Sequence, residues 1–144
     1  MSTGAYSLFI KLEKDKMIKI GKLGKFVFPK GFYVYTGSAL KNLEARIERH
    51  FKKRKKKFWH VDYLLQGEDV KIMYVVKVIT KLKIECELNR TLSKILKAYP
   101  IIKKFGSSDC KCESHLLYST KPIENLNFID ELVEELNRLS FDIS

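Results

Sequence analysis

The residues of this chain best suited to chemistry surround and follow a glycine. Residues 35–39 read Tyr-Thr-Gly-Ser-Ala, which predicts a strand that ends in a glycine turn, with Ser38 as the cap of the helix that follows. On that helix Arg46 and His50 are four positions apart, so their side chains share one flank. Because a guanidinium binds phosphate oxygens through paired donors and an imidazole exchanges protons near neutral pH, this spacing favours a site that acts on phosphodiesters.

A run of six cations follows the same helix directly. The run consists of Lys52, Lys53, Arg54, Lys55, Lys56 and Lys57. The 144-residue chain has 28 Lys and Arg against 17 Asp and Glu, a formal net charge of +11. Such an excess favours a polyanionic partner, because each phosphate contact releases condensed counterions. We therefore predict backbone contacts to DNA, or to RNA, that do not read sequence; the alternative is a solvated helix end whose cations suit the helix dipole.

The predicted binding surface extends to residues on either side of this run. We assign Gly37, Ser38 and His60 to it along with the six cations. Trp59 has two interpretations that the sequence leaves open, since an indole can stack on an unpaired base or anchor a hydrophobic core.

Glu85 is the most informative acidic residue. Leu88 and Leu92 predict a helix over 84–99 that Pro100 ends, with Glu85 facing inward in its first turn. An inward carboxylate that meets no cation carries a large desolvation cost. Glu85 is therefore either a ligand for a hard divalent ion, Mg²⁺ or Mn²⁺, or an acid stabilised by the helix dipole, and the sequence leaves both interpretations open.

A second set of metal-binding residue types lies nearby in the sequence. It comprises Cys86, Cys110, Cys112 and His115. Three thiols and one imidazole equal the donor count of a structural zinc site, although the Cys-Lys-Cys spacing is tighter than in common zinc motifs. The alternatives are a bridge from Cys110 or Cys112 to Cys86 and plain burial of the thiols.

The pattern of apolar residues predicts an α+β fold in one domain that spans 1–144. Strands are expected at 6–13, 17–20, 26–28, 32–35, 70–80 and 115–119, and helices after residue 38 and at 59–65, 84–99 and 127–140. Hairpin-spaced strands among long helices favour a small antiparallel sheet flanked by helices, with an extra N-terminal hairpin over 15–29. The strand at 70–80 is expected in the centre of that sheet because it is rich in β-branched residues.

Nothing in the sequence predicts an exported or membrane protein. No secretory signal precedes the first expected strand, and no apolar stretch approaches the ~20 residues that span a bilayer. We expect a cytoplasmic protein that does not contact a membrane.

Several of these residues together resemble a nuclease motif. Residues 4–6, Gly-Ala-Tyr, resemble the first element of the GIY-YIG motif, and residues 35–37, Tyr-Thr-Gly, resemble the second. Arg46 and His50 match the arginine and histidine of that superfamily's helix, and Glu85 matches its metal-binding glutamate. The two tripeptides are farther apart than is typical, because the hairpin at 15–29 lies between them.

The chain is still more similar to one branch of that superfamily, a domain of unknown function that occurs alone or fused to endonuclease III-type DNA glycosylases. The similarity runs from about residue 4 to residue 118, and its marks are the segments 28–31, 33–39, 46–50, 59–63, 85–86, 105–112 and 114–116. Gly-Phe-Tyr at 31–33 competes for the first tripeptide, but we prefer 4–6 because a partner for the Tyr35 strand must come from elsewhere in the sequence.

The resemblance implies a metal-dependent endonuclease that hydrolyses DNA phosphodiester bonds, in DNA repair or processing. Its catalytic residues would be Tyr6, Tyr35, Arg46, His50 and Glu85, with Mg²⁺ or Mn²⁺ on the glutamate. Two alternatives stand beside it. One is a noncatalytic nucleic-acid-binding module on the same fold, in which the tyrosines only pack; the other is a zinc-stabilised accessory domain.

Overall fold

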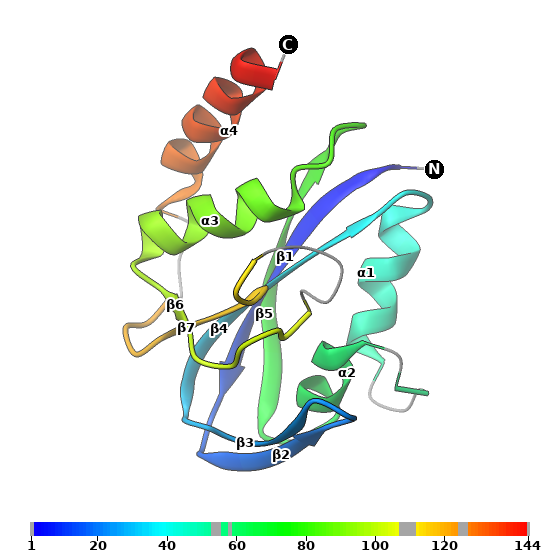
Figure 1. The fold of residues 1–144 in the computed structure, drawn as a ribbon, viewed down its shortest axis with the longest axis vertical. Helices are drawn as coiled ribbons and strands as arrows, with labels where there is room; N and C mark the ends of the chain where they lie inside the picture. Colours follow the sequence, from blue (N-terminus) through cyan, green and yellow to red (C-terminus); the bar gives the residue numbers. More distant parts are fainter. Residues whose placement is uncertain (1, 53–55, 58, 107–111, 124–126, 144) are drawn as a thin grey trace.

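The main sheet is antiparallel, and a strand over residues 4–12 pairs inside it with a strand over residues 31–39 (Figure 1). The computed structural model describes residues 2–52, 56, 57, 59–106, 112–123 and 127–143, with side chains up to residue 138. Its main sheet has the order β5-β1-β4-β7-β6. The bounds are β1 Gly4–Leu12, β4 Gly31–Ala39, β5 Val70–Ile79, β6 Tyr99–Pro100 and β7 Leu116–Ser119. The predicted α+β class with an antiparallel sheet is confirmed.

The predicted extra hairpin is also present. Strands β2 (Lys16–Ile20) and β3 (Gly24–Phe28) pair with each other in a separate two-stranded sheet. The hairpin lies at the end of the molecule opposite the C-terminus (Figure 1), and helix α2 (His60–Leu65) packs beside it. Because the hairpin only extends the connection between β1 and β4, these two strands still pair along their whole length.

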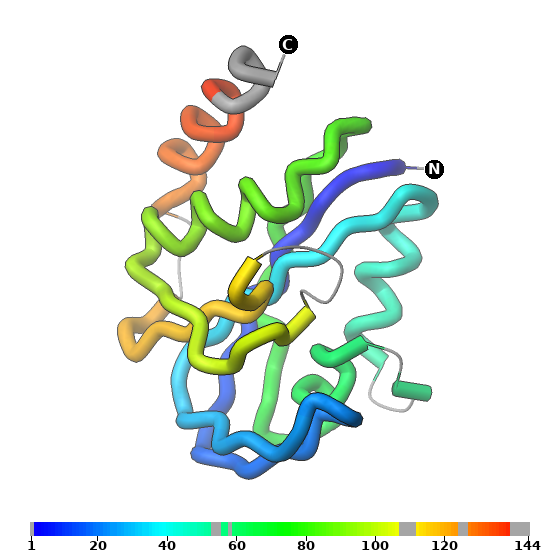
Figure 2. The backbone as a smooth tube through the Cα atoms, viewed as in Figure 1, coloured from blue at the N-terminus to red at the C-terminus, as the bar shows by residue number. Residues whose placement is uncertain are grey.

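Helices cover both faces of the main sheet, because β1 alternates apolar side chains between two cores. Tyr6, Leu8 and Ile10 pack with α1 (Leu43–Phe51) and α2, whereas Ala5 and Phe9 pack with α3 (Glu85–Leu96) and α4 (Ile129–Ile143). Strand β1 is therefore buried on both faces and paired on both edges. In Figure 2 its trace runs between those of β4 and β5. No helix in the described part of the chain is both long enough and apolar enough to cross a membrane.

The prediction that a glycine turn ends the strand at residue 37 is wrong. Strand β4 runs through Gly37 and Ser38 to Ala39, because β1 offers each of these residues a backbone partner. Helix α1 begins only at Leu43, and its cap is Asn42, whose Oδ1 accepts a hydrogen bond of 3.1 Å from Ala45 N. Strand pairing thus overrides the local turn signal.

Three other boundaries differ from the predictions. Strand β5 lies at the edge of the sheet rather than in its centre, next to β1. Helix α3 ends at Leu96, because Lys97 adopts a left-handed conformation (φ 53°), and Tyr99–Pro100 then pair with β7. Helix α4 begins at Ile129 rather than at 127 and continues past 140.

Residue 37 has to be a glycine because the Tyr6 ring, on the neighbouring strand β1, occupies the space of a side chain. Tyr6 and Gly37 are directly opposite each other, and the Tyr6 ring lies across the glycine. A Cβ added at Gly37 would lie 2.7 Å from Tyr6 Oη and 2.9 Å from its Cζ. The Tyr-Thr-Gly sequence thus makes room for a tyrosine from another strand.

We predict that Gly37→Ala destabilises the protein by about 1–3 kcal/mol, because a methyl group is forced against a buried ring. Urea unfolding monitored by circular dichroism measures the loss. The matched control is Gly67→Ala, where the nearest atom to a new Cβ is Nζ of the flexible Lys16, at 3.2 Å. Equal stability of Gly37→Ala and wild type would contradict the steric role of Tyr6.

Candidate functional site

The centre of the candidate site is a hydrogen bond between a strand and a helix. Tyr6 Oη of β1 lies 2.6 Å from Nε2 of His50, in the last turn of α1. Both side chains are buried, with 0% and 2% of their surface exposed. The structure therefore brings together two predicted site residues that are 44 positions apart in the sequence.

Tyr35 completes an aromatic cluster around this hydrogen bond. Its ring centroid is 6.5 Å from that of Tyr6 and 6.0 Å from that of His50. Gly106, which has a left-handed backbone (φ +66°), lies so close that a Cβ there would be 2.9 Å from the Tyr35 ring. The Tyr35 ring is thus held between β4 and the loop that follows β6.

Burial controls the protonation of both phenols. Desolvation raises the pKa of Tyr6 to about 12, although the charge of Arg46 and a hydrogen bond from it act in the opposite direction. Desolvation also raises the pKa of Tyr35. Tyr6 therefore keeps its proton at neutral pH, and a protonated phenol donates to Nε2 when His50 carries its own proton on Nδ1.

The Arg46 guanidinium lies against the indole ring of Trp59. Its guanidinium carbon is 4.2 Å from the centroid of the Trp59 ring, and that of Arg49 is 4.4 Å away. Arg46 Nε is a buried donor for which the described residues supply no hydrogen-bond acceptor. Trp59 therefore acts as a platform that holds the Arg46 cation beside Tyr6, with an Nε donor that no described residue uses.

The sequence analysis missed the ion pair that fixes this platform. Arg49 Nη1 lies 3.1 Å from each carboxylate oxygen of Asp62, which is completely buried. Asp62 also accepts a hydrogen bond of 2.9 Å from Trp59 N, so it ties the start of α2 to α1. The one sequence signal was an acid between the apolar residues of α2, which indicates a buried carboxylate with a partner.

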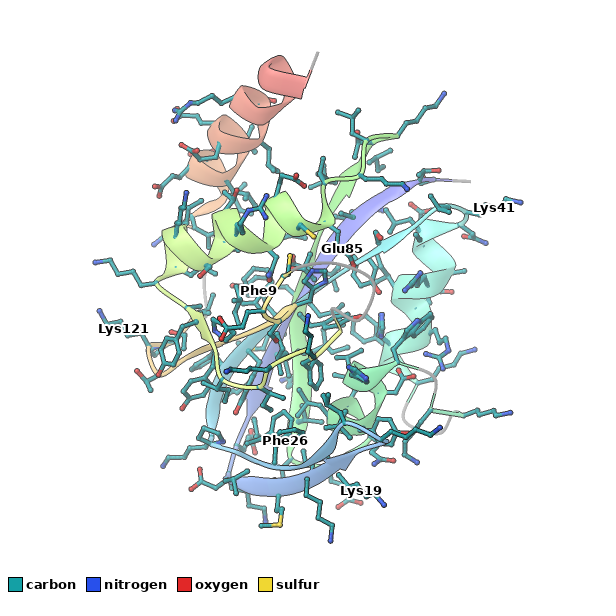
Figure 3. All side chains as sticks on the ribbon, in the orientation of Figure 1. Phe9, Lys19, Phe26, Lys41, Glu85 and Lys121 are labelled. Carbon is teal, nitrogen blue, oxygen red and sulfur yellow. The ribbon has the colours of Figure 1, made fainter. Side chains whose placement is uncertain are left out.

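Glu85 approaches the phenols from the opposite layer of the molecule. It is the first residue of α3, and Figure 3 labels it at the end of that helix nearest to α1 in this view. Pairing of β4 with β7 stops at Tyr35 and Leu116, and just beyond this point Nδ1 of His115 lies 3.5 Å from Glu85 Oε1. The negative charge of Glu85 contributes to the raised pKa of Tyr6 and of Tyr35, so it acts on the same site.

The donor chemistry of Glu85 fits a hard divalent ion. Its side chain is 30% exposed, so the carboxylate is reachable from solvent. Mg²⁺ in proteins commonly takes one or two carboxylates and completes its shell with water and substrate phosphate. A different donor set lies beside it, because the ligand atoms of Cys86, Cys112 and His115 all lie within 4.8 Å of one another.

Other predicted residues have structural contacts or lie outside the described residues. His60 Nδ1 accepts a hydrogen bond of 2.8 Å from Gly106 N, so this ring nitrogen holds the loop over Tyr35. The side chains of Lys52, Lys56 and Lys57, the members of the basic run that the structure describes, are exposed. The remaining predicted positions, Lys53, Arg54, Lys55 and Cys110, are outside the part of the chain that the structure describes.

Comparison with known proteins places the chain in a family. The model of a family described as a domain of unknown function, DUF123, matches residues 5–138, and the chain belongs to that family. Comparisons with curated proteins and with solved structures gave no match.

We predict that the stability of the protein falls above pH 10 and that Tyr6 accounts for part of the fall. Below pH 10 the phenol is neutral in both states; between pH 10 and pH 12 the unfolded chain loses this proton while the native protein keeps it. One such group contributes roughly 2–3 kcal/mol over this interval. Urea unfolding from pH 8 to pH 12 on wild type and Tyr6→Phe measures the difference. Identical pH dependence in the two proteins would contradict the raised pKa.

Proposed function

We propose that this member of the DUF123 family is a metal-dependent endonuclease that hydrolyses DNA phosphodiester bonds. The observation that carries the proposal is the 2.6 Å hydrogen bond between Tyr6 and His50, with Arg46 beside it and the charge of Glu85 in range. The likeness of residues 4–6 and 35–37 to the GIY-YIG tripeptides supports it, since these segments lie on the paired strands β1 and β4. A role in DNA repair or processing is proposed from that resemblance alone.

Arg46 is proposed to bind the scissile phosphate. A phosphate oxygen would supply the acceptor that the buried Nε lacks among the described residues. The guanidinium lies over the Trp59 ring, which restricts its movement, and the paired N–H donors of a guanidinium match the geometry of a phosphate. A directed cation stabilises the charge that builds on the phosphate during in-line attack by water.

Tyr6 and His50 are proposed to remove the proton of the attacking water. A phenol with a pKa of about 12 is mostly protonated at neutral pH, so Tyr6 alone is a poor base. If the water gives its proton to Tyr6 Oη while the phenol gives its own to His50 Nε2, no phenolate has to persist. The adjacent Arg46 charge favours each anionic stage of this transfer.

Glu85 is the proposed ligand for Mg²⁺ or Mn²⁺. The ion would polarise the phosphate and stabilise the leaving oxygen when bound. Glu85 suits this role because it presents hard oxygen donors, is partly exposed and is near enough for its charge to act on the Tyr6 phenol. The exposed lysines at 52, 56 and 57 lie close in sequence to the end of α1 and would add backbone affinity for DNA.

The second candidate is a noncatalytic nucleic-acid-binding module. The observation that favours it is the complete burial of Tyr6, because a general base must reach a water molecule. The net charge of +11 serves binding with or without cleavage. The two candidates differ in one outcome, which is metal-dependent cutting.

We predict that the protein nicks or cleaves labelled DNA in the presence of Mg²⁺ or Mn²⁺. The panel contains duplex, nicked, abasic, flap and branched substrates. We expect Glu85→Ala to abolish cleavage, because the metal ligand is removed, and Arg46→Ala to lower kcat about 10²–10³-fold, because a transition-state donor is removed. Gel analysis of the products measures both effects.

Matched variants exclude a contaminating nuclease and general unfolding. Glu87→Ala removes an acid from the same turn of α3, and Arg138→Ala removes a surface cation of α4. Both should cleave as wild type does, and all variants should give native circular dichroism spectra. If every substrate stays intact with wild type, or if Glu85→Ala still cuts, the catalytic proposal is wrong.

We also predict that the exposed lysines of the basic run set the salt dependence of DNA binding. Replacement of Lys52, Lys56 and Lys57 by glutamine should lower the slope of log K against log salt by about 0.9 for each phosphate that the protein no longer neutralises. Fluorescence anisotropy with a short duplex measures this slope. The control carries Gln at the exposed positions Lys71 on β5, Lys94 on α3 and Lys121 just after β7. Equal slopes in both triple variants would remove the basic run from the binding surface.

A further inference from the structure

Two cysteine thiols and one histidine imidazole lie close together between the first turn of α3 and the segment just before β7. Cys86 is the second residue of α3, and Cys112 and His115 precede β7. The Sγ atom of Cys86 lies 3.7 Å from Nε2 of His115, and the three ligand atoms all lie within 4.8 Å of one another. Cys86 and His115 are 29 positions apart, so the fold rather than the local sequence brings them together.

We propose that Cys86, Cys112 and His115 bind a zinc ion and that Glu85 orients the imidazole ligand. Tetrahedral zinc with sulfur at about 2.3 Å and nitrogen at about 2.0–2.1 Å separates a sulfur from a nitrogen by about 3.6 Å and two sulfurs by about 3.8 Å. The observed 3.7 Å between Cys86 and His115 agrees with this value. Two thiolates and an imidazole select zinc over Mg²⁺ or Ca²⁺, which prefer oxygen ligands.

The two nitrogens of His115 face two different partners. Nε2 points to Cys86, and Nδ1 lies 3.5 Å from Glu85 Oε1, within ion-pair distance of the carboxylate. A metal-bound histidine commonly donates its other N–H to a carboxylate, which fixes the ring and its tautomer. A buried imidazole placed between a thiol and a carboxylate is the arrangement that such a site requires.

The surroundings of the cluster also suit a bound ion. A cavity of about 380 Å³ is lined by Cys86, Cys112 and Asn89, among others. Asn89 is 5% exposed and donates to Ser114 O at 2.8 Å, but its Oδ1 is buried and accepts no hydrogen bond from the described residues. A donor inside the cavity, such as a water molecule on zinc, would satisfy that oxygen, whose isolation otherwise costs about 1–3 kcal/mol.

This zinc site would position the acid of the proposed nuclease. Glu85 precedes Cys86 directly, so a zinc ion would fix the start of α3 through Cys86 and the Glu85 carboxylate through His115. This consequence rests on the proposed function, whereas zinc binding itself does not. The two proposals therefore need separate measurements.

Metal analysis of the 144-residue chain tests the zinc site without DNA. We expect one equivalent of zinc in wild type, and we expect the cobalt-substituted protein to show a thiolate-to-cobalt charge-transfer band together with tetrahedral d–d bands. Cys112→Ser should lose the bound zinc and weaken the charge-transfer band. Circular dichroism of each variant verifies that it is folded, and titration of wild type with a zinc chelator gives the affinity independently of any variant.

Glu85→Gln tests the orienting role of the carboxylate. We expect a 10–100-fold lower zinc affinity, because the carboxylate beside Nδ1 of His115 is replaced by a neutral amide. Glu113→Gln is the matched control, since Glu113 lines the same cavity and should bind zinc as wild type does. Absence of stoichiometric zinc and of the cobalt bands in folded wild type, or a disulfide found by mass spectrometry in their place, would overturn the proposal. Zinc bound without any DNA cleavage would overturn only the nuclease.

Discussion

The site and the core depend on the buried hydrogen bond between Tyr6 and His50. It joins the central strand β1 to the last turn of α1, and both groups leave water when they form it. A buried phenol without a partner would be costly, so this pair fixes how α1 sits on the sheet. The position of α1 then decides where Arg46 lies over Trp59.

The α+β class was predictable from the sequence, and so were the pairing of β1 with β4 and the hairpin of β2 and β3. Alternating apolar residues located β1 and β4, and the similarity of residues 4–6 and 35–37 to known tripeptides indicated that Tyr6 and Tyr35 belong together. The boundary at Gly37 was wrong for a physical reason. A glycine beside a serine is typical of a turn, but this glycine makes room for the Tyr6 ring, and that ring comes from another strand.

The partners of side chains that become buried only in the folded structure could not be predicted from the sequence. The sequence shows Asp62 as an acid between apolar residues but does not identify its partners, which are the guanidinium of Arg49 and the backbone N–H of Trp59. The contact of Glu85 with His115 was likewise hidden, because it forms past the end of the pairing between β4 and β7. Local propensity carries no information on where a short strand stops.

The position of β1 in the sheet affects the order in which the strands can pair during folding. The segment 4–12 is made before its partners, yet one of its neighbours is β5, which begins only at Val70. Closing such long loops before their contacts form slows folding. During synthesis on the ribosome, the edge of β1 that pairs with β5 therefore stays unpaired until β5 has emerged.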